Sequence, residues 1–340
     1  MWYLLALVAL NLPPVSPTAP NRQPQLAAAD GTVAMVFGSG DSIWLAQSTD
    51  DGLNFAAPAK VAELPKLLLG RHRGPRVAIT GGMILISAIA STPGDLMLWR
   101  SSDNGRTWTA PRAINDQPSA AREGLHAMAA DKSGHVAIAW LDDRSGKGKR
   151  LYAAFSNDAG ATWGGNVALY ESPSGSICEC CHPSLAALGE GRFAVMWRNS
   201  LGGNRDLFVM QVRDGVRLSD PVQQGNFSWQ LNACPMDGGG LAIREGRIGS
   251  AFRREKDVYL AEPGKPERRL ATGQDIALGA NNQGWYAVWS TAQGIDAMLP
   301  GGSTVTHLSS AGAFPAIVKT SGGGMLIAWE ENGAISTARL

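Results

Sequence analysis

The chain has 340 residues, of which 44% are hydrophobic, and 30 Lys and Arg against 29 Asp and Glu leave a formal net charge of +1. This length allows two average domains or one all-β ring of repeats, and the apolar fraction suffices for a large core. The near-neutral charge argues against nucleic acid or an anionic membrane surface as a general partner. The 41 Gly and 19 Pro are typical of many short strands joined by turns.

The first twelve residues, MWYLLALVALNL, form an apolar run that is too short to span a bilayer. A proline-rich stretch follows at 13–17, as after the apolar part of a secretory signal, but no basic segment precedes the run. We therefore expect residues 1–20 to be either a signal-like apolar segment or a strand that closes the fold. The first alternative predicts a periplasmic or secreted protein without a membrane span.

From residue 24 onward one pattern returns along the chain. A short strand of small apolar residues leads through a Gly-rich turn to a second strand, which ends in an aromatic or charged residue. Seven such units begin near positions 25, 76, 126, 183, 240, 275 and 314. Small residues suit inner strands that crowd around an axis, and no window has the period of a helix.

These units predict that residues 21–340 form a single all-β domain, a β-propeller of four-stranded blades. We expect seven blades, and six is the alternative if one unit has been over-counted. Each of the first six units is followed by two more plausible strands, whereas the last ends three strands in. A strand from the N-terminal segment would complete the last blade and remove the free edges of the ring.

A second repeat, S-x-D-x-G-x-T-W, occurs at 101–108 and 156–163, and in a weaker form at 48–55. In such a segment the Asp accepts hydrogen bonds from its own tight turn, and the Gly supplies a positive φ angle. A spacing near 50 residues is typical of propellers and related arrays. The pattern resembles the Asp box, or BNR repeat, of the sialidase-like β-propellers. That resemblance implies Asp boxes on outer turns, away from the axis, with a structural role.

The cysteines precede the inner strands of two adjacent units, which we expect to lie side by side, so we predict one cluster near the axis. They are Cys178, Cys180 and Cys181 before the fourth unit, and Cys234 before the fifth. Three interpretations remain open. The thiols could form two disulfides, of which the one from Cys234 would clamp two blades together. They could bind a soft metal ion, copper or zinc, with His126 and His182 completing or shielding the site. A free thiol could also be reactive.

Arginines gather on loops of the same face. The sialidase resemblance implies three arginines that hold a substrate carboxylate through bidentate contacts, a Tyr–Glu nucleophile pair and an Asp acid/base. The candidates for ligand binding are Arg73, Arg198, Arg253 and, as a stacking platform for a sugar ring, Trp229. Asp142 and Asp143 are weak candidates for acid/base catalysis, and a turn with a local ion pair is the alternative. No tyrosine stands where the late nucleophile is expected, and the Arg-Ile-Pro pattern near the N-terminus is missing.

The leading hypothesis is an exported sialidase-like propeller that binds a small-molecule, carbohydrate or metal ligand at a cysteine-lined axial mouth, without ordinary sialidase chemistry. The second is an exo-sialidase or related glycoside hydrolase with a rearranged site. The third is an interaction module of the cell envelope, with an envelope protein as partner and the cysteines as structural disulfides. The sequence suggests no cofactor beyond copper or zinc.

Overall fold

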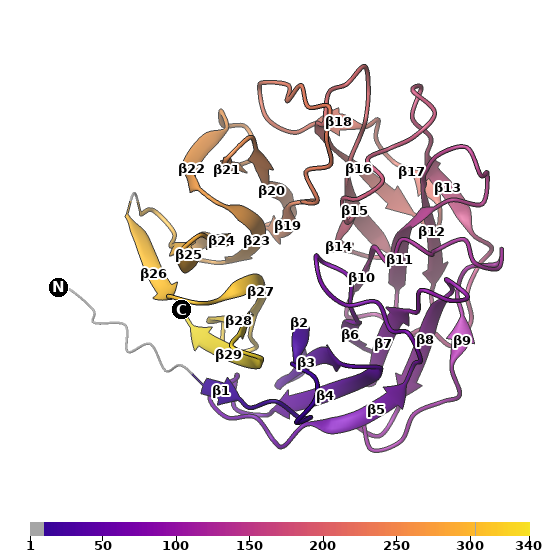
Figure 1. Ribbon diagram of the computed structural model, residues 1–340, viewed down its shortest axis with the longest axis vertical. Coiled ribbons are helices and arrows are strands. Elements are labelled where there is room, and N and C mark those ends of the chain that lie inside the picture. Colours follow the sequence, from indigo (N-terminus) through magenta and orange to yellow (C-terminus); the bar gives the residue numbers. More distant parts are fainter. Residues whose placement is uncertain (1–9, 303) are drawn as a thin grey trace.

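The chain forms a ring of seven antiparallel blades around a central axis (Figure 1). This computed structural model describes residues 10–302 and 304–340. Six blades have four strands, and the fourth blade has five because its outer strand is split in two. The prediction of a seven-bladed, all-β propeller is confirmed.

The strands occupy equivalent places from blade to blade. The innermost strands are β2 (Arg22–Ala29), β6 (Arg76–Thr80), β10 (His126–Ala130), β14 (Ser184–Gly189), β19 (Gly240–Arg244), β23 (Gln274–Asn281) and β27 (Ala313–Lys319). The second strands are β3 (Thr32–Ser39), β7 (Met83–Ile89), β11 (Val136–Asp142), β15 (Arg192–Arg198), β20 (Arg247–Arg254), β24 (Gly284–Thr291) and β28 (Met325–Glu331). The third strands are β4 (Ser42–Ser48), β8 (Leu96–Ser101), β12 (Arg150–Ser156), β16 (Leu207–Arg213), β21 (Asp257–Ala261), β25 (Gly294–Met298) and β29 (Ala334–Arg339). The outer strands are β5 (Ala59–Glu63), β9 (Arg112–Ala113), β13 (Val167–Tyr170), the pair β17 (Val216–Arg217) and β18 (Val222–Gln223), β22 (Arg268–Thr272), β26 (Val305–Ser309) and β1 (Leu10–Leu12).

Strand β1 closes the ring, because it pairs antiparallel with β29 and so becomes the outer strand of the last blade (Figure 1). Leu10 lies opposite Thr337, and Leu12 opposite Ile335. The expected closing strand is therefore present at Leu10–Leu12. Residues 1–9, which carry most of the predicted signal, lie outside the described residues, and their export function stays a prediction. Within the described ranges no helix is long and apolar enough to cross a membrane.

Large aromatic side chains near the ends of the second strands fill the spaces between blades. They are Phe37, Trp140, Trp197, Phe252, Trp289 and Trp329, each 3% exposed or less. Trp140, for example, packs in one buried cluster with leucines of the preceding blade, and Trp197 does the same one blade further on. Each such side chain removes about 150–250 Å² from water, which makes the inter-blade layers the main apolar core.

The three S-x-D-x-G segments form the same turn between the third and outer strands of the first three blades. In the second blade, Ser101 Oγ contacts Asp103 Oδ1 at 2.8 Å and accepts the Gly105 N–H at 2.8 Å. Asp103 in turn accepts the N–H and hydroxyl of Thr107. The corresponding bonds recur around Asp50 and Asp158. Because each turn satisfies its own hydrogen bonds through Ser and Asp, these bonds account for the residues that recur in the three segments.

One end of the ring carries the longer loops. It collects the segments that enter the inner strands and those that join second and third strands. The long ones belong to blades two to five and span 64–75, 114–125, 143–149, 171–183, 199–206 and 224–239. The opposite end has tight turns between inner and second strands, together with the S-x-D-x-G segments that join third and outer strands at 49–58, 102–111 and 157–166. Functional side chains are expected on long loops that a rigid scaffold positions.

Candidate functional site at the axial mouth

The four cysteines meet where the loops 171–183 and 224–239 approach one another. Cys180 and Cys234 form a disulfide with Cα atoms 6.3 Å apart, linking the loops that enter β14 and β19. The predicted clustering of the cysteines near the axis is confirmed, and the bridge from Cys234 joins loops that enter adjacent blades. The spacing alone allowed three partners for Cys234, and the structure selects Cys180.

The other two cysteines, Cys178 and Cys181, are free and buried. Their sulfur atoms lie 2.9 Å apart, and the Cys178 Sγ lies 3.7 Å from the Cys180 Sγ. The backbone N–H of Cys178 donates to the carbonyl of Arg198 at the end of β15, which fixes the loop against its own blade. Three sulfurs therefore converge on one point beneath the loop surface.

The sulfur cluster has a suitable size for a metal ion. The Sγ atoms of Cys178, Cys180 and Cys181 all lie within 4.8 Å of one another, and no His, Asp or Glu of the described residues joins this group. A zinc–thiolate bond of about 2.3 Å places neighbouring sulfurs about 4 Å apart, so small side-chain shifts would give each sulfur a ligand position. While the disulfide is intact, however, Cys180 has no thiolate to offer. The bridged chain presents two sulfur ligands, and the reduced chain presents three.

The two free thiols differ in acidity. The hydrogen bond with Cys181 lowers the pKa of Cys178 to about 7, and the nearby guanidinium groups of Arg198 and Arg205 act in the same direction. Burial raises the pKa of Cys181 well above its usual value. A thiolate is the form that binds metal and attacks disulfides, so Cys178 is the more reactive of the pair.

Next to the cysteines, His182 turns toward the axis and stacks on His72, with ring centroids 4.1 Å apart. His72 Nε2 lies 2.8 Å from Asp275 Oδ1. His182 Nδ1 accepts the N–H of Gly238, and its Nε2 lies 3.1 Å from the carbonyl oxygen of Gly239. Burial, together with the neighbouring His72 and Arg76, keeps the pKa of His182 well below its usual value, so this imidazole is neutral.

These side chains border an axial cavity of about 230 Å³, which all seven inner strands line. Ligand sites usually measure about 300–1,000 Å³, so the cavity suits an ion or a small group better than a whole sugar. The buried Asp275 Oδ2 has no hydrogen-bond partner among the described residues. The contact between His72 and Asp275 was not predicted; His72 lies four residues before β6, and Asp275 is the second residue of β23.

Several non-glycine residues at this mouth have positive φ angles. They are Gln23 (55°), Arg71 (50°), His72 (66°), Met236 (58°), Asp275 (54°) and Phe314 (54°). Such conformations cost free energy for residues with a Cβ and persist where the surrounding structure imposes them. Their position around the axis indicates that the mouth is held in a defined shape.

Buried Arg198 holds the surrounding loops through three backbone carbonyl groups. Arg198 donates from Nε to the Asp237 carbonyl and from its terminal nitrogens to the carbonyls of Arg205 and Arg253. The ring of Trp229, only 7% exposed, lies beneath the guanidinium groups of Arg198 and Arg253. The predicted ligand residues Arg198, Arg253 and Trp229 are thus brought together, but they contact one another and the backbone.

The remaining arginine candidate, Arg73, belongs to an ion-pair network on the loops of blades two and three. Its Nε donates to the carbonyl of Glu123 at 2.6 Å. Lys149 Nζ lies 3.0 Å from both the Glu123 and the Asp143 carboxylates, and Asp143 also pairs with Arg122. Asp143 Oδ1 has no hydrogen-bond partner within the described ranges. Asp143 is therefore part of a charged cluster rather than an isolated carboxylate.

Asp142 lies in the local ion pair that was the alternative to an acid/base role. Its two oxygens accept hydrogen bonds from Nε and a terminal nitrogen of Arg144, at 2.9 Å each, and from the Trp140 indole.

His126, at the start of β10, contacts Ser87 through its Nε2 atom at 2.9 Å, and its backbone carbonyl accepts a hydrogen bond from Arg76. Burial lowers the pKa of His126 well below its usual value.

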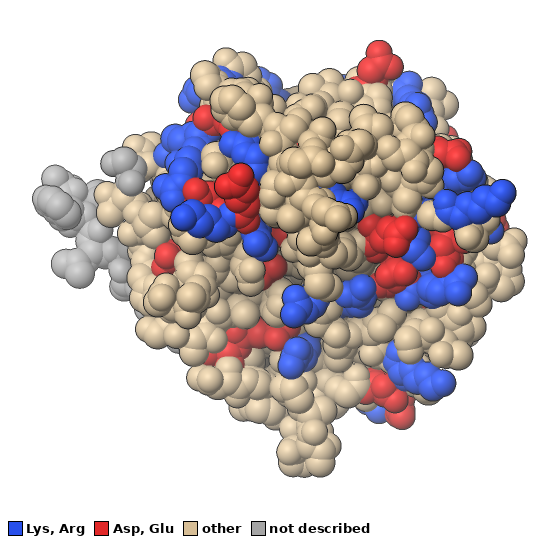
Figure 2. Space-filling model, turned by 45° about the horizontal axis from the view of Figure 1, so that its top comes forward, with Lys and Arg blue, Asp and Glu red and all other residues tan. Residues whose placement is uncertain are grey.

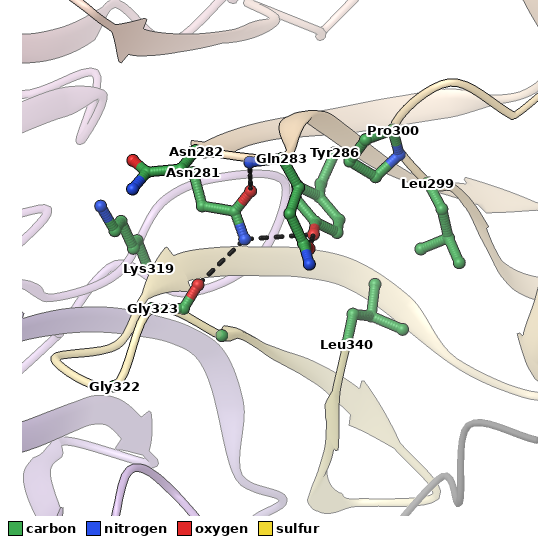
Figure 3. Close-up of a pocket in the computed structure, with 11 residues that line it drawn as sticks. Asn281, Asn282, Gln283, Tyr286, Leu299, Pro300, Lys319, Gly322, Gly323 and Leu340 are labelled. Carbon is green, nitrogen blue, oxygen red and sulfur yellow. Dashed lines mark hydrogen bonds between the residues drawn. The ribbon is translucent and has the colours of Figure 1, made fainter. Parts of the chain in front are cut away.

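A larger groove, of about 880 Å³, lies at the opposite end of the ring between the last two blades. Asn281 organises its floor by donating to the Tyr286 hydroxyl and to the carbonyl of Gly323 (Figure 3). Lys319 is the one charged side chain among its lining residues. Its size suits a small molecule, but no group there is placed for catalysis.

Charges of both signs are interspersed on the face drawn in Figure 2, and no extended area of a single sign is visible. This distribution agrees with the net charge of +1. Recognition on this face therefore depends on individual side chains and not on a general field.

No protein-family model matches the chain. Among solved structures, the protein is similar to a Hadza microbial sialidase, with 16% identity, 94% of this chain and 65% of that chain covered, and a TM-score of 0.53. The chain thus spans slightly less than two thirds of that sialidase. The intramolecular trans-sialidase from Ruminococcus gnavus is similar over 94% of both chains, with 10% identity and a TM-score of 0.55. A fucose-recognising, six-bladed lectin from Aleuria aurantia is similar with 12% identity and a TM-score of 0.52, and the match covers 84% of this chain and 96% of the lectin chain. At these identities the likeness concerns the fold, and the fold is that of a sialidase-like β-propeller.

Proposed function

We propose that this protein is an exported β-propeller that binds a soft metal ion, Cu⁺ in the first place, through the cysteines of its axial mouth. The observation that carries the proposal is the convergence of three sulfur atoms within 4.8 Å of one another. Thiolate ligands select Cu⁺ and Zn²⁺ over hard cations. Cu⁺ also accepts two or three sulfur ligands, which fits a site whose third sulfur is in a disulfide.

The surroundings of the cluster support metal binding over glycoside hydrolysis. The Arg198 guanidinium is engaged with three backbone carbonyls, so it is not free to hold a substrate carboxylate. The axial cavity of about 230 Å³ is also small for a sialic acid. We accordingly expect no turnover, or very weak turnover, of a fluorogenic sialoside. Efficient release of sialic acid would instead support the second hypothesis, a hydrolase with a rearranged site.

A competition titration under anaerobic conditions tests the proposal. The fully reduced protein should withdraw stoichiometric Cu⁺ from a chromogenic chelator such as bathocuproine disulfonate. Cys178→Ala and Cys181→Ala should each weaken this binding strongly because each removes a converging sulfur. Cys234→Ala keeps all three sulfurs of the cluster and serves as the matched control. A wild-type protein that withdraws no more Cu⁺ than the double variant Cys178→Ala/Cys181→Ala contradicts the proposal.

A further inference from the structure

The four cysteines form two pairs at different depths. In the outer pair, the disulfide Cys180–Cys234, Cys234 is exposed and Cys180 is half-buried. The inner pair, Cys178 and Cys181, is buried and reduced. The inner sulfurs are 2.9 Å apart, closer than two carbon atoms in ordinary non-bonded contact, which lie about 3.5–4.0 Å apart. A thiol pair this close needs little movement to form a bond.

The two pairs are also close to each other. Cys178 Sγ lies 3.7 Å from the sulfur of Cys180, so a free thiol is in contact with one sulfur of an existing disulfide. Thiol–disulfide exchange requires this kind of contact, because the attacking thiolate must reach a disulfide sulfur directly. Buried free thiols can also pack as small apolar side chains, so the contact between a free thiol and the disulfide carries the inference, and burial alone does not.

We propose that the cluster is a thiol–disulfide relay, in which one disulfide moves between the outer pair Cys180–Cys234 and the inner pair Cys178–Cys181. The exchange itself is independent of metal. Its consequence for metal binding, given below, rests on the proposed function.

The transfer takes two steps and needs no external oxidant or reductant. In the first, the Cys178 thiolate attacks Cys180 Sγ, a Cys178–Cys180 bond forms, and Cys234 leaves as a thiolate that takes up the proton lost from Cys178. In the second, the Cys181 thiolate attacks Cys178 Sγ, and Cys180 leaves and is protonated in turn. The chain begins and ends with one disulfide and two thiols, so electrons and protons balance.

The position of the outer pair makes the relay accessible from solvent. A cavity of about 380 Å³ adjoins the cluster, and Cys178, Arg205 and Cys234 are among its lining residues. A small thiol or a cysteine of another protein could therefore exchange at the exposed Cys234, whereas Cys178 and Cys181 are each only 1% exposed.

The position of the disulfide determines whether the two loops are linked and how many sulfur atoms are free to bind a metal ion. With the bond in the outer pair, the loops entering β14 and β19 are clamped, and two sulfurs remain for a metal ion. With the bond in the inner pair, the clamp is open, and two thiols, Cys180 and Cys234, face the surface. Only full reduction leaves the three converging thiols available together.

Peptide mapping of the metal-free, one-disulfide protein tests the relay. Trypsin places Cys178, Cys180 and Cys181 in the peptide 151–192 and Cys234 in the peptide 218–244. An outer disulfide joins these peptides, whereas an inner disulfide lies within the first. The folded protein with only its outer disulfide is held in a chelating buffer, samples are quenched with acid over time, and free thiols are alkylated.

We expect the joined peptides to decrease in wild type, while the disulfide within 151–192 and free Cys234 increase together. Cys178→Ser should keep the peptides fully joined, because it lacks the attacking thiol. Cys181→Ser should stop at a bond between Cys178 and Cys180. Peptides that stay fully joined in wild type, with Cys178 and Cys181 alkylated throughout, overturn the relay, and this time course requires no variant to fold.

The metal titration is a separate measurement and distinguishes the two ideas. If reduced protein binds no Cu⁺ but the disulfide moves, the proposed function fails and the relay stands. If Cu⁺ binds but the disulfide does not move, the relay is wrong and the metal site stands.

Discussion

His72 stacks on His182 across the axial mouth, with ring centroids 4.1 Å apart and planes inclined by 29°. The first imidazole comes from the loop that enters β6 and the second from the loop that enters β14, directly after the cysteine cluster. Because His72 also contacts Asp275 at 2.8 Å, three blades meet in one chain of side-chain contacts. This chain connects the sulfur cluster to the axial cavity and explains why the mouth has a fixed shape.

Replacing His72 with Ala should destabilise the protein, because it leaves the buried carboxylate of Asp275 without its side-chain partner. The expected loss is about 1–3 kcal/mol in the free energy of unfolding, measured with urea. His307→Ala is the matched control, since His307 contacts Asp296 at the same 2.8 Å but has a side chain that is 50% exposed. Equal effects of the two substitutions would show that the His72–Asp275 contact contributes little.

Loss of the Cys180–Cys234 bridge should also lower stability. The bond joins positions 54 residues apart, and closing a loop of that length in the unfolded chain is worth about 2–4 kcal/mol. Denaturation of Cys234→Ser should therefore coincide with that of wild type under reducing conditions and fall below that of the oxidised wild type. If Cys234→Ser is as stable as the oxidised wild type, the bridge does not clamp the blades.

The turn aspartates predict an acid-sensitive contribution to stability. Hydrogen bonds from Thr107 and Thr162 lower the pKa of Asp103 and Asp158, respectively, from 3.8 to about 2. Because these folded-state values lie below the unfolded ones, the contribution is fully present above about pH 4 and is lost as the pH falls toward 2. Asp158→Asn should lower the melting temperature by a few degrees at pH 7, and by less near pH 2. A difference from wild type that does not shrink on acidification would contradict this assignment. Cu⁺ binding should be unchanged.

Arg198→Lys separates a structural role from ligand binding at this position. Lysine cannot reach all three carbonyls that the guanidinium satisfies, so we expect a loss of about 1–3 kcal/mol in unfolding free energy. Arg247→Lys is the control, because Arg247 is exposed and pairs only with Glu245 among the described residues. A fully stable Arg198→Lys variant with altered ligand binding would restore Arg198 as a recognition residue.

The sequence predicted the architecture well because its repeats are local. Small residues in inner strands, aromatic residues near the ends of second strands and turn-forming aspartates each follow from neighbours a few positions away. The closing strand was predicted from the incomplete last unit, since a free edge would otherwise remain. Six blades was the alternative, and the pairing of β1 with β29 completes the seventh.

The site was harder to predict because it depends on contacts between distant loops. Adjacent inner strands placed the cysteines together, but the choice of Cys180 for Cys234 depends on loop geometry that spacing does not encode. The pairing of His72 with Asp275 joins residues 203 positions apart, and the repeat pattern does not relate the loop of His72 to the inner strand of Asp275. Trp229 stands in a loop, so its sequence context did not show that two arginines would cover its ring.

The most direct test of the account is X-ray absorption spectroscopy at the copper edge on Cu⁺-loaded, reduced protein. We predict a first shell of two or three sulfur atoms that is lost in Cys178→Ala/Cys181→Ala and retained in Cys234→Ala. A shell of nitrogen or oxygen atoms, or the same sulfur shell in the Cys178→Ala/Cys181→Ala variant, would contradict the proposal that the axial cysteine cluster is a soft-metal site.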